Sequence, residues 1–162
     1  VSSRGLGDVY KRQSLIFGVF LQSLLNFFSF EIYGSSIPIT LMILIYWNIA
    51  LPKNIGLSWS FIAGILLDLN LGYFLGTHVI LFLFISYLTQ RYFHRIRAMF
   101  QIQQSLLIAS IVFLYLLSLY VFFQEFSFFV ILAIILNSLI SAFVWPILFG
   151  LLRIIRRKYT YA

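Results

Sequence analysis

The sequence has 162 residues, of which 62% are hydrophobic and only 9% are charged. Because a soluble domain carries roughly 25% charged residues to give its core a solvated surface, this composition excludes an ordinary soluble globular protein and indicates that lipid is the solvent. The net charge of +7 would suggest a nucleic acid partner for a soluble protein, but here the basic residues follow apolar runs, which favours anionic lipid headgroups and no nucleic acid.

Residues 1–13, VSSRGLGDVYKRQ, are polar and contain two glycines, with no apolar period. We interpret them as a non-native or disordered flank and leave them out of the fold prediction. Residues 14–162 predict one all-α domain, a polytopic integral membrane helical bundle, because a hydrocarbon core of about 30 Å needs roughly 20 helical residues per span. The six predicted spans cover residues 14–30, 37–51, 55–71, 77–90, 105–123 and 128–152. Their short connections make consecutive helices antiparallel neighbours.

Basic residues gather on one side of this topology: at the N-terminus, after the second and fourth spans, and at the C-terminus. They include Lys11, Arg12, Lys53, Arg91, Arg95, Arg97, Arg153, Arg156, Arg157 and Lys158. The other connections contain no Lys or Arg, and they carry Glu31 and Glu125. The positive-inside rule therefore places both termini and a basic face in the cytoplasm of a multi-pass protein.

The segment 91–97, RYFHRIR, interleaves arginine with aromatic residues. Such a pattern is found in proteins that bind single-stranded nucleic acid. At the end of an apolar span it favours an interfacial helix whose arginines reach the lipid headgroups. The same surface is suited to docking a cytoplasmic partner.

Asp68 is the one acidic residue inside a predicted span. Since a carboxylate costs about 2.5–3.5 kcal/mol at the centre of a bilayer on insertion scales, an intramembrane acid suggests a function. It belongs to a series that recurs every four positions: Gly56, Ser60, Gly64, Asp68, Gly72 and Gly76. Four residues advance about 400° around a helix, so the series predicts a stripe for close helix packing or partner contact. We expect Asp68 to accept hydrogen bonds from a neighbouring helix or from the backbone near Gly72, with a ligand contact or a proton relay as alternatives.

The last span carries a comparable stripe, formed by Ala133, Asn137, Ser141 and Trp145 and followed by Pro146. We expect Asn137, Ser138 and Ser141 to hydrogen-bond across helices. Pro146 removes one backbone hydrogen bond and is expected to kink the helix. These residues are further candidates for helix packing or partner contact.

Histidine and cysteine give no indication of a metal site or a catalytic centre. The sequence lacks cysteine, which excludes disulfides, thiolate ligands and cysteine nucleophiles. His78 and His94 are predicted at opposite faces of the membrane, with no acidic cluster beside them. A Ser–His–Asp arrangement through His78 and Asp68 is geometrically possible, but no serine context such as GxSxG is present. We therefore expect no enzyme, no metal and no cofactor.

The motifs follow one another in an order that resembles a known family. The end of the second span reads Tyr46-Trp47-x-x-Ala50-Leu51-Pro52, and the series around Asp68 comes directly after it. Asn137 and Trp145-Pro146 come later, before a basic tail. This order resembles the MreD family of bacterial rod-shape-determining inner-membrane proteins, over essentially all of residues 14–162.

The resemblance implies a non-enzymatic scaffold in the bacterial cytoplasmic (inner) membrane, needed for rod shape and peptidoglycan synthesis. It implies MreC, a single-span protein with an extracytoplasmic domain, as direct partner, with MreB, RodA and a penicillin-binding transpeptidase joined through the complex. We expect recruitment on the short outer face above Asp68. The fold is similar to the substrate-binding subunits of vitamin-uptake transporters, so an uptake subunit with a pocket near Asp68, Gly72, His78 and Glu125 is the alternative.

Overall fold

The computed structural model describes residues 13–24, 37–51, 57–123 and 127–160, and all regular secondary structure in these ranges is helical. The first helix is Gln13–Leu24. It is followed by α2 (Ile39–Ala50), α3 (Leu57–Leu71), α4 (Thr77–Arg91), α5 (Phe93–Ala98), α6 (Gln101–Phe123) and α7 (Phe128–Thr160). The predicted all-α class is confirmed for the described ranges.

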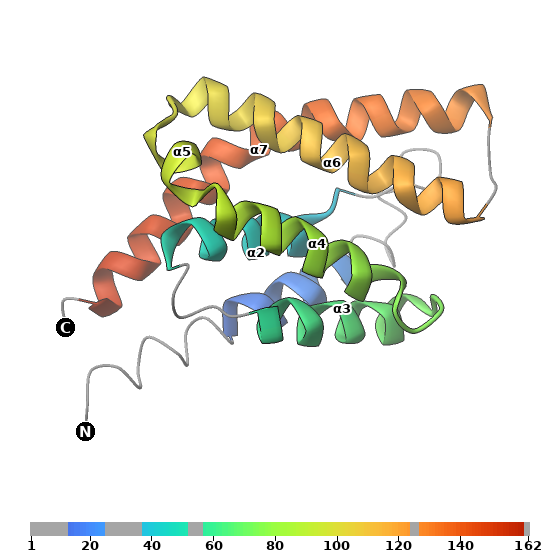
Figure 1. Cartoon of the computed structure of the whole chain (residues 1–162), viewed down its shortest axis with the longest axis horizontal. Helices are drawn as coiled ribbons and strands as arrows, with labels where there is room; N and C mark the ends of the chain where they lie inside the picture. The colour runs from blue at the N-terminus through green and yellow to red at the C-terminus, as the bar shows by residue number, and fades with distance from the viewer. Residues whose placement is uncertain (1–12, 25–36, 52–56, 124–126, 161–162) are drawn as a thin grey trace.

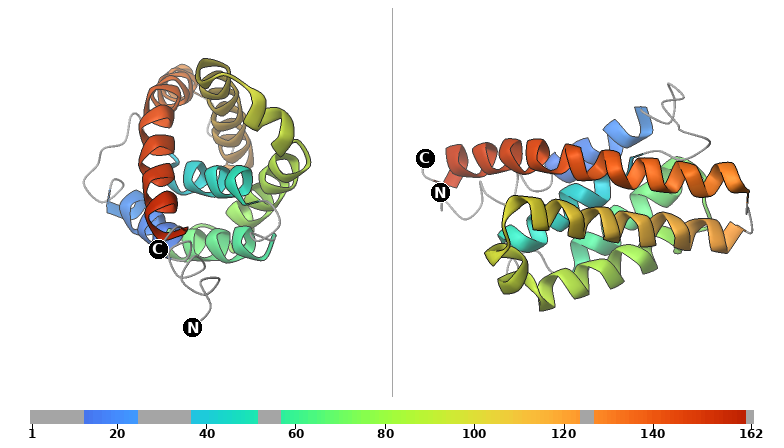
Figure 2. Two further views of the ribbon diagram at one scale, coloured as in Figure 1. Left: turned by 90° about the vertical axis from the view of Figure 1, so that its left-hand side faces the viewer. Right: turned by 90° about the horizontal axis from the view of Figure 1, so that it is seen from above.

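Helix α2 forms the centre of the bundle. Ten of its twelve residues are buried, and in the view along the bundle it lies inside a ring of the other helices (Figure 2). Its residues are apolar on nearly every side, as expected for a helix enclosed by protein. The helix Gln13–Leu24 is bonded to it twice: the Trp47 indole donates to Ser14 Oγ (2.8 Å), and the Thr40 backbone N–H donates to Gln22 Oε1 (3.1 Å).

Helices α3 and α4 form a closely packed pair. Gly64 lies at the closest approach, where a Cβ atom would come within 2.6 Å of the Val79 Cα atom. Ser60, Gly64 and Asp68 all lie on the face of α3 that is buried. This part of the predicted stripe is therefore covered by α4 of the same chain.

The turn over residues 72–76 joins α3 to α4. Gly72 (φ 71°) and Gly76 (φ 109°) adopt left-handed backbone conformations that residues with a Cβ atom rarely tolerate. The Tyr73 N–H donates to the Asp68 carbonyl (3.1 Å), which ends α3 in a Schellman motif. Gly72 and Gly76 thus form the turn instead of continuing the helix stripe, because α3 ends at Leu71. Gly56 lies outside the described residues.

Helices α6 and α7 are the longest and lie side by side (Figure 1). Among the described residues, Gln101–Phe122 and Phe128–Arg157 are long and apolar enough to cross a membrane, whereas Gln13–Leu24, Ile39–Ala50 and Leu57–Leu71 are shorter apolar helices. Large apolar side chains on α7 face outwards, with Phe128 76% and Phe143 78% exposed. Such a surface is suited to lipid and not to water. The count of six spans stays a prediction.

The two ends of the bundle differ in charge. The α3–α4 turn, the end of α6 and the start of α7 lie at the right in Figure 1, whereas α5 and the end of α7 lie at the left. We call the left end the basic end, because it carries Arg91, Arg95, Arg97, Arg153, Arg156 and Arg157. Lys11, Arg12, Glu31, Lys53, Glu125 and the side chain of Lys158 lie outside the described residues. The gathering of the arginines agrees with the charge asymmetry on which the prediction of cytoplasmic termini rests.

Candidate functional site

The carboxylate of Asp68 is completely buried and accepts three hydrogen bonds from the start of α4. The Gly76 N–H donates to Oδ2 (2.8 Å), the His78 N–H donates to Oδ1 (3.0 Å), and His78 Nδ1 lies 2.6 Å from Oδ1. The first N–H groups of a helix have no acceptor within that helix. The Asp68 carboxylate therefore supplies the acceptor for N–H groups at the start of α4. We call Asp68, Gly76 and His78 the Asp68 cluster.

His78 is buried and surrounded by aromatic rings. Its ring centroid lies 5.0 Å from that of Tyr73, 6.0 Å from Tyr115 and 6.1 Å from Phe82. Since a carboxylate only accepts hydrogen bonds, the proton between His78 and Asp68 belongs to Nδ1 when Asp68 is ionised. The cluster therefore joins α3, α4 and α6 around one polar contact.

The Asp68 cluster lacks the three ligands that a metal ion would need among the described residues. The described residues contain no group of three His, Cys, Asp or Glu side chains that could hold a metal ion. The hydrogen-bond donors of the cluster come from a helix N-terminus and one imidazole. This arrangement fixes the start of α4 on α3, which is a structural use of a buried acid.

A second polar group lies deeper between α2, α3 and α4. Ser86 Oγ accepts hydrogen bonds from the Asn48 side-chain amide (2.9 Å) and from Ser60 Oγ (2.7 Å). The Gln90 amide in turn donates to Asn48 Oδ1 (2.9 Å). Ser60 of α3 is thus bonded to Ser86 of α4. Asn48 of the central helix is bonded to two residues of α4, Ser86 and Gln90.

Ser86→Ala is expected to lower the free energy of unfolding by about 1–3 kcal/mol. The change removes the acceptor of the Asn48 amide and the partner of Ser60, leaving buried polar atoms unpaired. Ser110→Ala is the matched control, because the Ser110 hydroxyl is exposed and donates to Leu106 O of its own helix; its effect should stay below about 0.5 kcal/mol. Denaturant titration of the purified protein in detergent measures both, and equal effects would contradict the role of the buried network.

The polar stripe of α7 is buried, and its serine hydroxyls bond within their own helix. Asn137, Ser141 and Trp145 are each at most 1% exposed. Ser141 Oγ donates to Asn137 O (2.8 Å) and Ser138 Oγ to Ile135 O (2.7 Å), so the expected bonds of these two hydroxyls to another helix are not formed. Pro146 lies inside α7, which continues to Thr160.

Arg97 has a structural contact that its position in a basic segment did not reveal. Its guanidinium donates to the carbonyls of Ile49 and Ala50, the last residues of α2. A cation at a helix C-terminus satisfies free carbonyls and complements the helix dipole. Arg91 instead donates to Tyr87 Oη (3.0 Å), and Arg95 lies 6.0 Å from the ring centre of Tyr92.

Comparison with known proteins identifies the family to which this chain belongs. The family described as rod shape-determining protein MreD matches residues 12–155. A rod shape-determining protein MreD from Haemophilus influenzae is 34% identical over 120 residues, covering 72% of this chain and 73% of that protein. The chain belongs to the MreD family. No solved structure matches it significantly.

Membership in the MreD family agrees with the helical membrane character of the fold and carries a role in determining rod shape. The matched range contains the Asp68 cluster, the network around Ser86 and the stripe of α7. The match gives no support to the vitamin-uptake alternative.

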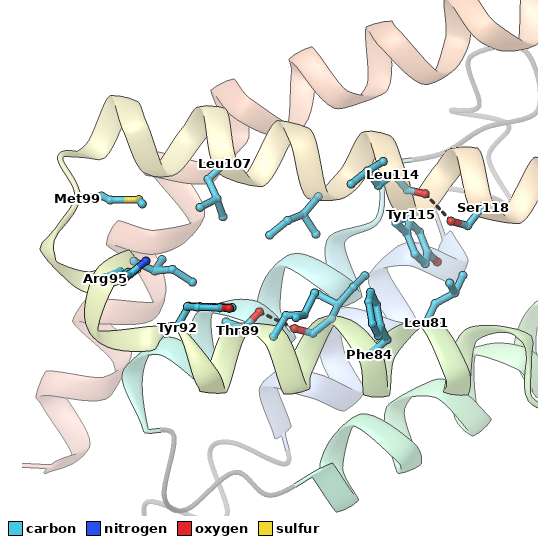
Figure 3. Close-up of a pocket in the computed structure, with 14 residues that line it drawn as sticks. Leu81, Phe84, Thr89, Tyr92, Arg95, Met99, Leu107, Leu114, Tyr115 and Ser118 are labelled. Atoms are coloured by element: carbon cyan, nitrogen blue, oxygen red, sulfur yellow. Dashed lines mark hydrogen bonds between the residues drawn. The ribbon is translucent and has the colours of Figure 1, made fainter.

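This MreD-family chain also has an apolar groove between α4, α5 and α6, with a volume of about 370 Å³ (Figure 3). Phe84 from α4 and Leu107 and Leu114 from α6 line it. The hydroxyls of Thr89 and Ser118 donate to carbonyls of their own helices, Ile85 O and Leu114 O. The groove is therefore suited to apolar groups.

Several residues that connect the helices were missed by sequence reasoning. They are Asn48, Ser86, Gln90 and Arg97. The pairing of His78 with Asp68 was considered only as part of a Ser–His–Asp arrangement or an uptake pocket. The available signal was that Asn48 and Ser86 are polar residues inside apolar runs, and polar residues in a membrane helix tend to face other helices.

Proposed function

We propose that this chain is a non-enzymatic scaffold of the bacterial cell-elongation machinery and acts through binding of MreC in the cytoplasmic membrane. The family match over residues 12–155 carries the proposal. The named relative is a rod shape-determining protein. MreB, RodA and a penicillin-binding transpeptidase join through the same complex, which links the scaffold to peptidoglycan synthesis.

The use of polar groups in the described bundle supports a scaffold. Asp68 and His78 bond to each other, and Ser60 and Ser86 do the same. An enzyme or a transporter presents converging polar groups to a substrate, whereas these groups hold helices together. The outward surfaces are instead rich in large apolar side chains, which suit lipid and partner spans.

The contact with MreC is expected at the end of the bundle that carries the α3–α4 turn. The face of α3 with Ser60, Gly64 and Asp68 is covered by α4, so a partner meets the exposed residues around it. Phe74 in the turn is 80% exposed and apolar. Ile154, exposed at 64%, provides a matched position at the basic end.

Depletion of the chain in its host is expected to round the cells, and purification of the tagged chain is expected to recover MreC. A photo-crosslinking residue at position 74 should capture MreC, whereas the same residue at position 154 should not. Cells that remain rods after complete depletion would contradict the proposed function. Capture at position 154 alone would place the contact at the opposite end.

A further inference from the structure

The apolar groove between α4 and α6 lies where two pairs of helices meet. Among the described helices, α4 packs mainly on α2 and α3, and α6 packs mainly on α7, whereas α4 and α6 have little contact with each other. Side chains from both helices line the groove, among them Phe84 of α4 and Leu107 of α6 (Figure 3). Phe84 is 61% exposed, and Leu114 on the α6 side is 60% exposed. The groove is therefore open to the surroundings of the protein, and an occupant there would contact both pairs of helices.

The walls of the groove favour an apolar occupant. The hydroxyls of Thr89 and Ser118, which lie along it, donate to carbonyls of their own helices. Most of the other lining residues are aliphatic or aromatic. Helix α6 is one of the described helices that are long and apolar enough to cross a membrane, so the wall that it forms faces hydrocarbon. An occupant therefore comes from the chains of lipids or from the apolar face of another helix.

The shape of the groove favours a lipid chain over a helix. Its lining residues on α4 extend from Leu81 to Tyr92, which is about three helical turns or about 16 Å. Its volume of about 370 Å³ is nevertheless smaller than that of a single helical turn, which is about 420 Å³ for a cylinder about 10 Å wide and about 5.4 Å high. An unbranched hydrocarbon chain is only about 4 Å across, since carbon atoms pack at that distance. The long and narrow space therefore suits one extended chain.

The two ends of the groove differ in chemistry. Arg95 and Tyr92 lie at the end next to α5, whereas Leu81 and Ser118 lie at the other end (Figure 3). The Arg95 guanidinium is 6.0 Å from the ring centre of Tyr92, and tyrosine and arginine are residues that commonly lie at the level of lipid headgroups. The planar donors of an arginine match the oxygens of a phosphate. We propose that the groove binds one acyl chain of a membrane phospholipid and that Arg95 binds the phosphate of the same molecule.

The proposed contact requires a phosphate group and not a net negative headgroup. Every glycerophospholipid carries such a phosphate, so the proposal does not depend on the net charge of the residues around Arg95. The bound chain would fill the space between the α3–α4 pair and the α6–α7 pair, where unfilled volume costs dispersion contacts. It would thus stabilise the packing of the two pairs against each other. The proposal rests on the groove alone and is independent of MreC binding.

The first experiment fills the groove with a larger side chain. The full chain is purified in a neutral detergent, and its binding of phosphatidylethanolamine is measured by native mass spectrometry. Leu107→Trp is expected to weaken binding about 10-fold or more, because the added ring occupies the groove and the acyl chain loses its contacts. Leu106→Trp is the matched control, since Leu106 is the adjacent residue, is 64% exposed and does not line the groove. Binding by this control should change less than about 2-fold.

The second experiment tests the phosphate contact with two lipids that have the same acyl chains. Arg95→Gln is expected to weaken the binding of phosphatidylethanolamine about 10-fold, because a charge-assisted hydrogen bond is lost. It should change the binding of diacylglycerol, which has no phosphate, less than about 2-fold. Arg95 is exposed, so the variant is expected to fold. Arg91→Gln is the matched control, since Arg91 donates to Tyr87 Oη and does not line the groove; it should change neither lipid more than about 2-fold.

Three results would overturn the proposal. Equal binding of phosphatidylethanolamine by Leu107→Trp and Leu106→Trp, with both variants folded, would place the lipid outside the groove. Equal effects of Arg95→Gln on phosphatidylethanolamine and diacylglycerol would remove the contact with the phosphate. A photo-crosslinking residue at the lining position 114 is expected to capture a phospholipid in cells. Capture of MreC there without any phospholipid would assign the groove to a partner helix.

Discussion

Gly64→Ala is expected to destabilise the protein by about 1–3 kcal/mol or more, even though alanine is the better helix former. The added Cβ atom would lie 2.6 Å from Val79 Cα and 2.8 Å from Val79 N, both of which are backbone atoms. A backbone cannot rotate away as a side chain can, so α3 and α4 must separate. That movement also stretches the bonds of Ser60 to Ser86 and of Asp68 to His78.

Gly150→Ala is the matched control for this substitution. Gly150 is also helical, but a Cβ atom there would meet nothing within 4 Å. Its stability should change by less than about 0.5 kcal/mol or increase slightly. Unfolding in detergent and abundance in the membrane fraction measure both variants, and equal stabilities would show that α3 and α4 do not depend on close contact at Gly64.

Asp68→Ala is expected to cost about 3–5 kcal/mol, the range typical for breaking a buried polar pair by removing one partner. The backbone N–H groups of Gly76 and His78 and the His78 ring would all lose their acceptor. Asp68→Asn should cost less, because the amide oxygen still accepts on one side while its NH₂ group faces a donor on the other. Chemical unfolding of the purified variants gives the order wild type, Asn, Ala.

Measuring MreC recruitment by the Asp68→Asn variant distinguishes a structural role of the Asp68 carboxylate from a functional one. If Asp68 only accepts hydrogen bonds, Asp68→Asn should keep MreC recruitment wherever its abundance is normal. A double-mutant cycle with His78→Phe isolates the side-chain pair, and its coupling energy should be smaller than the whole effect of Asp68→Ala, since the two backbone donors remain. Loss of recruitment in Asp68→Asn at normal abundance would show that the charge itself matters.

Hydropathy predicted the ends of a helix well where proline residues flank it. It predicted them poorly where the helix continues into a charged segment. The span predicted at 37–51 corresponds to α2, Ile39–Ala50, which lies between Pro38 and Pro52. The span predicted to end at 152 continues as α7 to Thr160. Arg153 and Arg157 end an apolar run but are good helix formers, so a hydropathy boundary is not a helix boundary.

The candidate site was predictable in part. A buried acid that accepts hydrogen bonds from the α3–α4 turn and from the neighbouring helix follows from the position of Asp68 among glycines, and the donors are Gly76 of the turn and His78 of α4. The pairs Asn48–Ser86 and Arg97–Ile49 join residues 38 and 48 positions apart. No local period encodes such pairs, because they depend on which helix faces meet after packing.

The enclosed position of α2 has a consequence for biogenesis. Its neighbours α4, α5 and α7 are all synthesised after it, so it leaves the ribosome before most of its enclosure exists. Until then Asn48 has neither Ser86 nor Gln90, and unpaired polar groups are costly in lipid. If α2 stays beside the insertion machinery, or binds a temporary partner there, its Asn48 side chain is not left unpaired in lipid. The central helix thus becomes fully packed only after α7 has been synthesised.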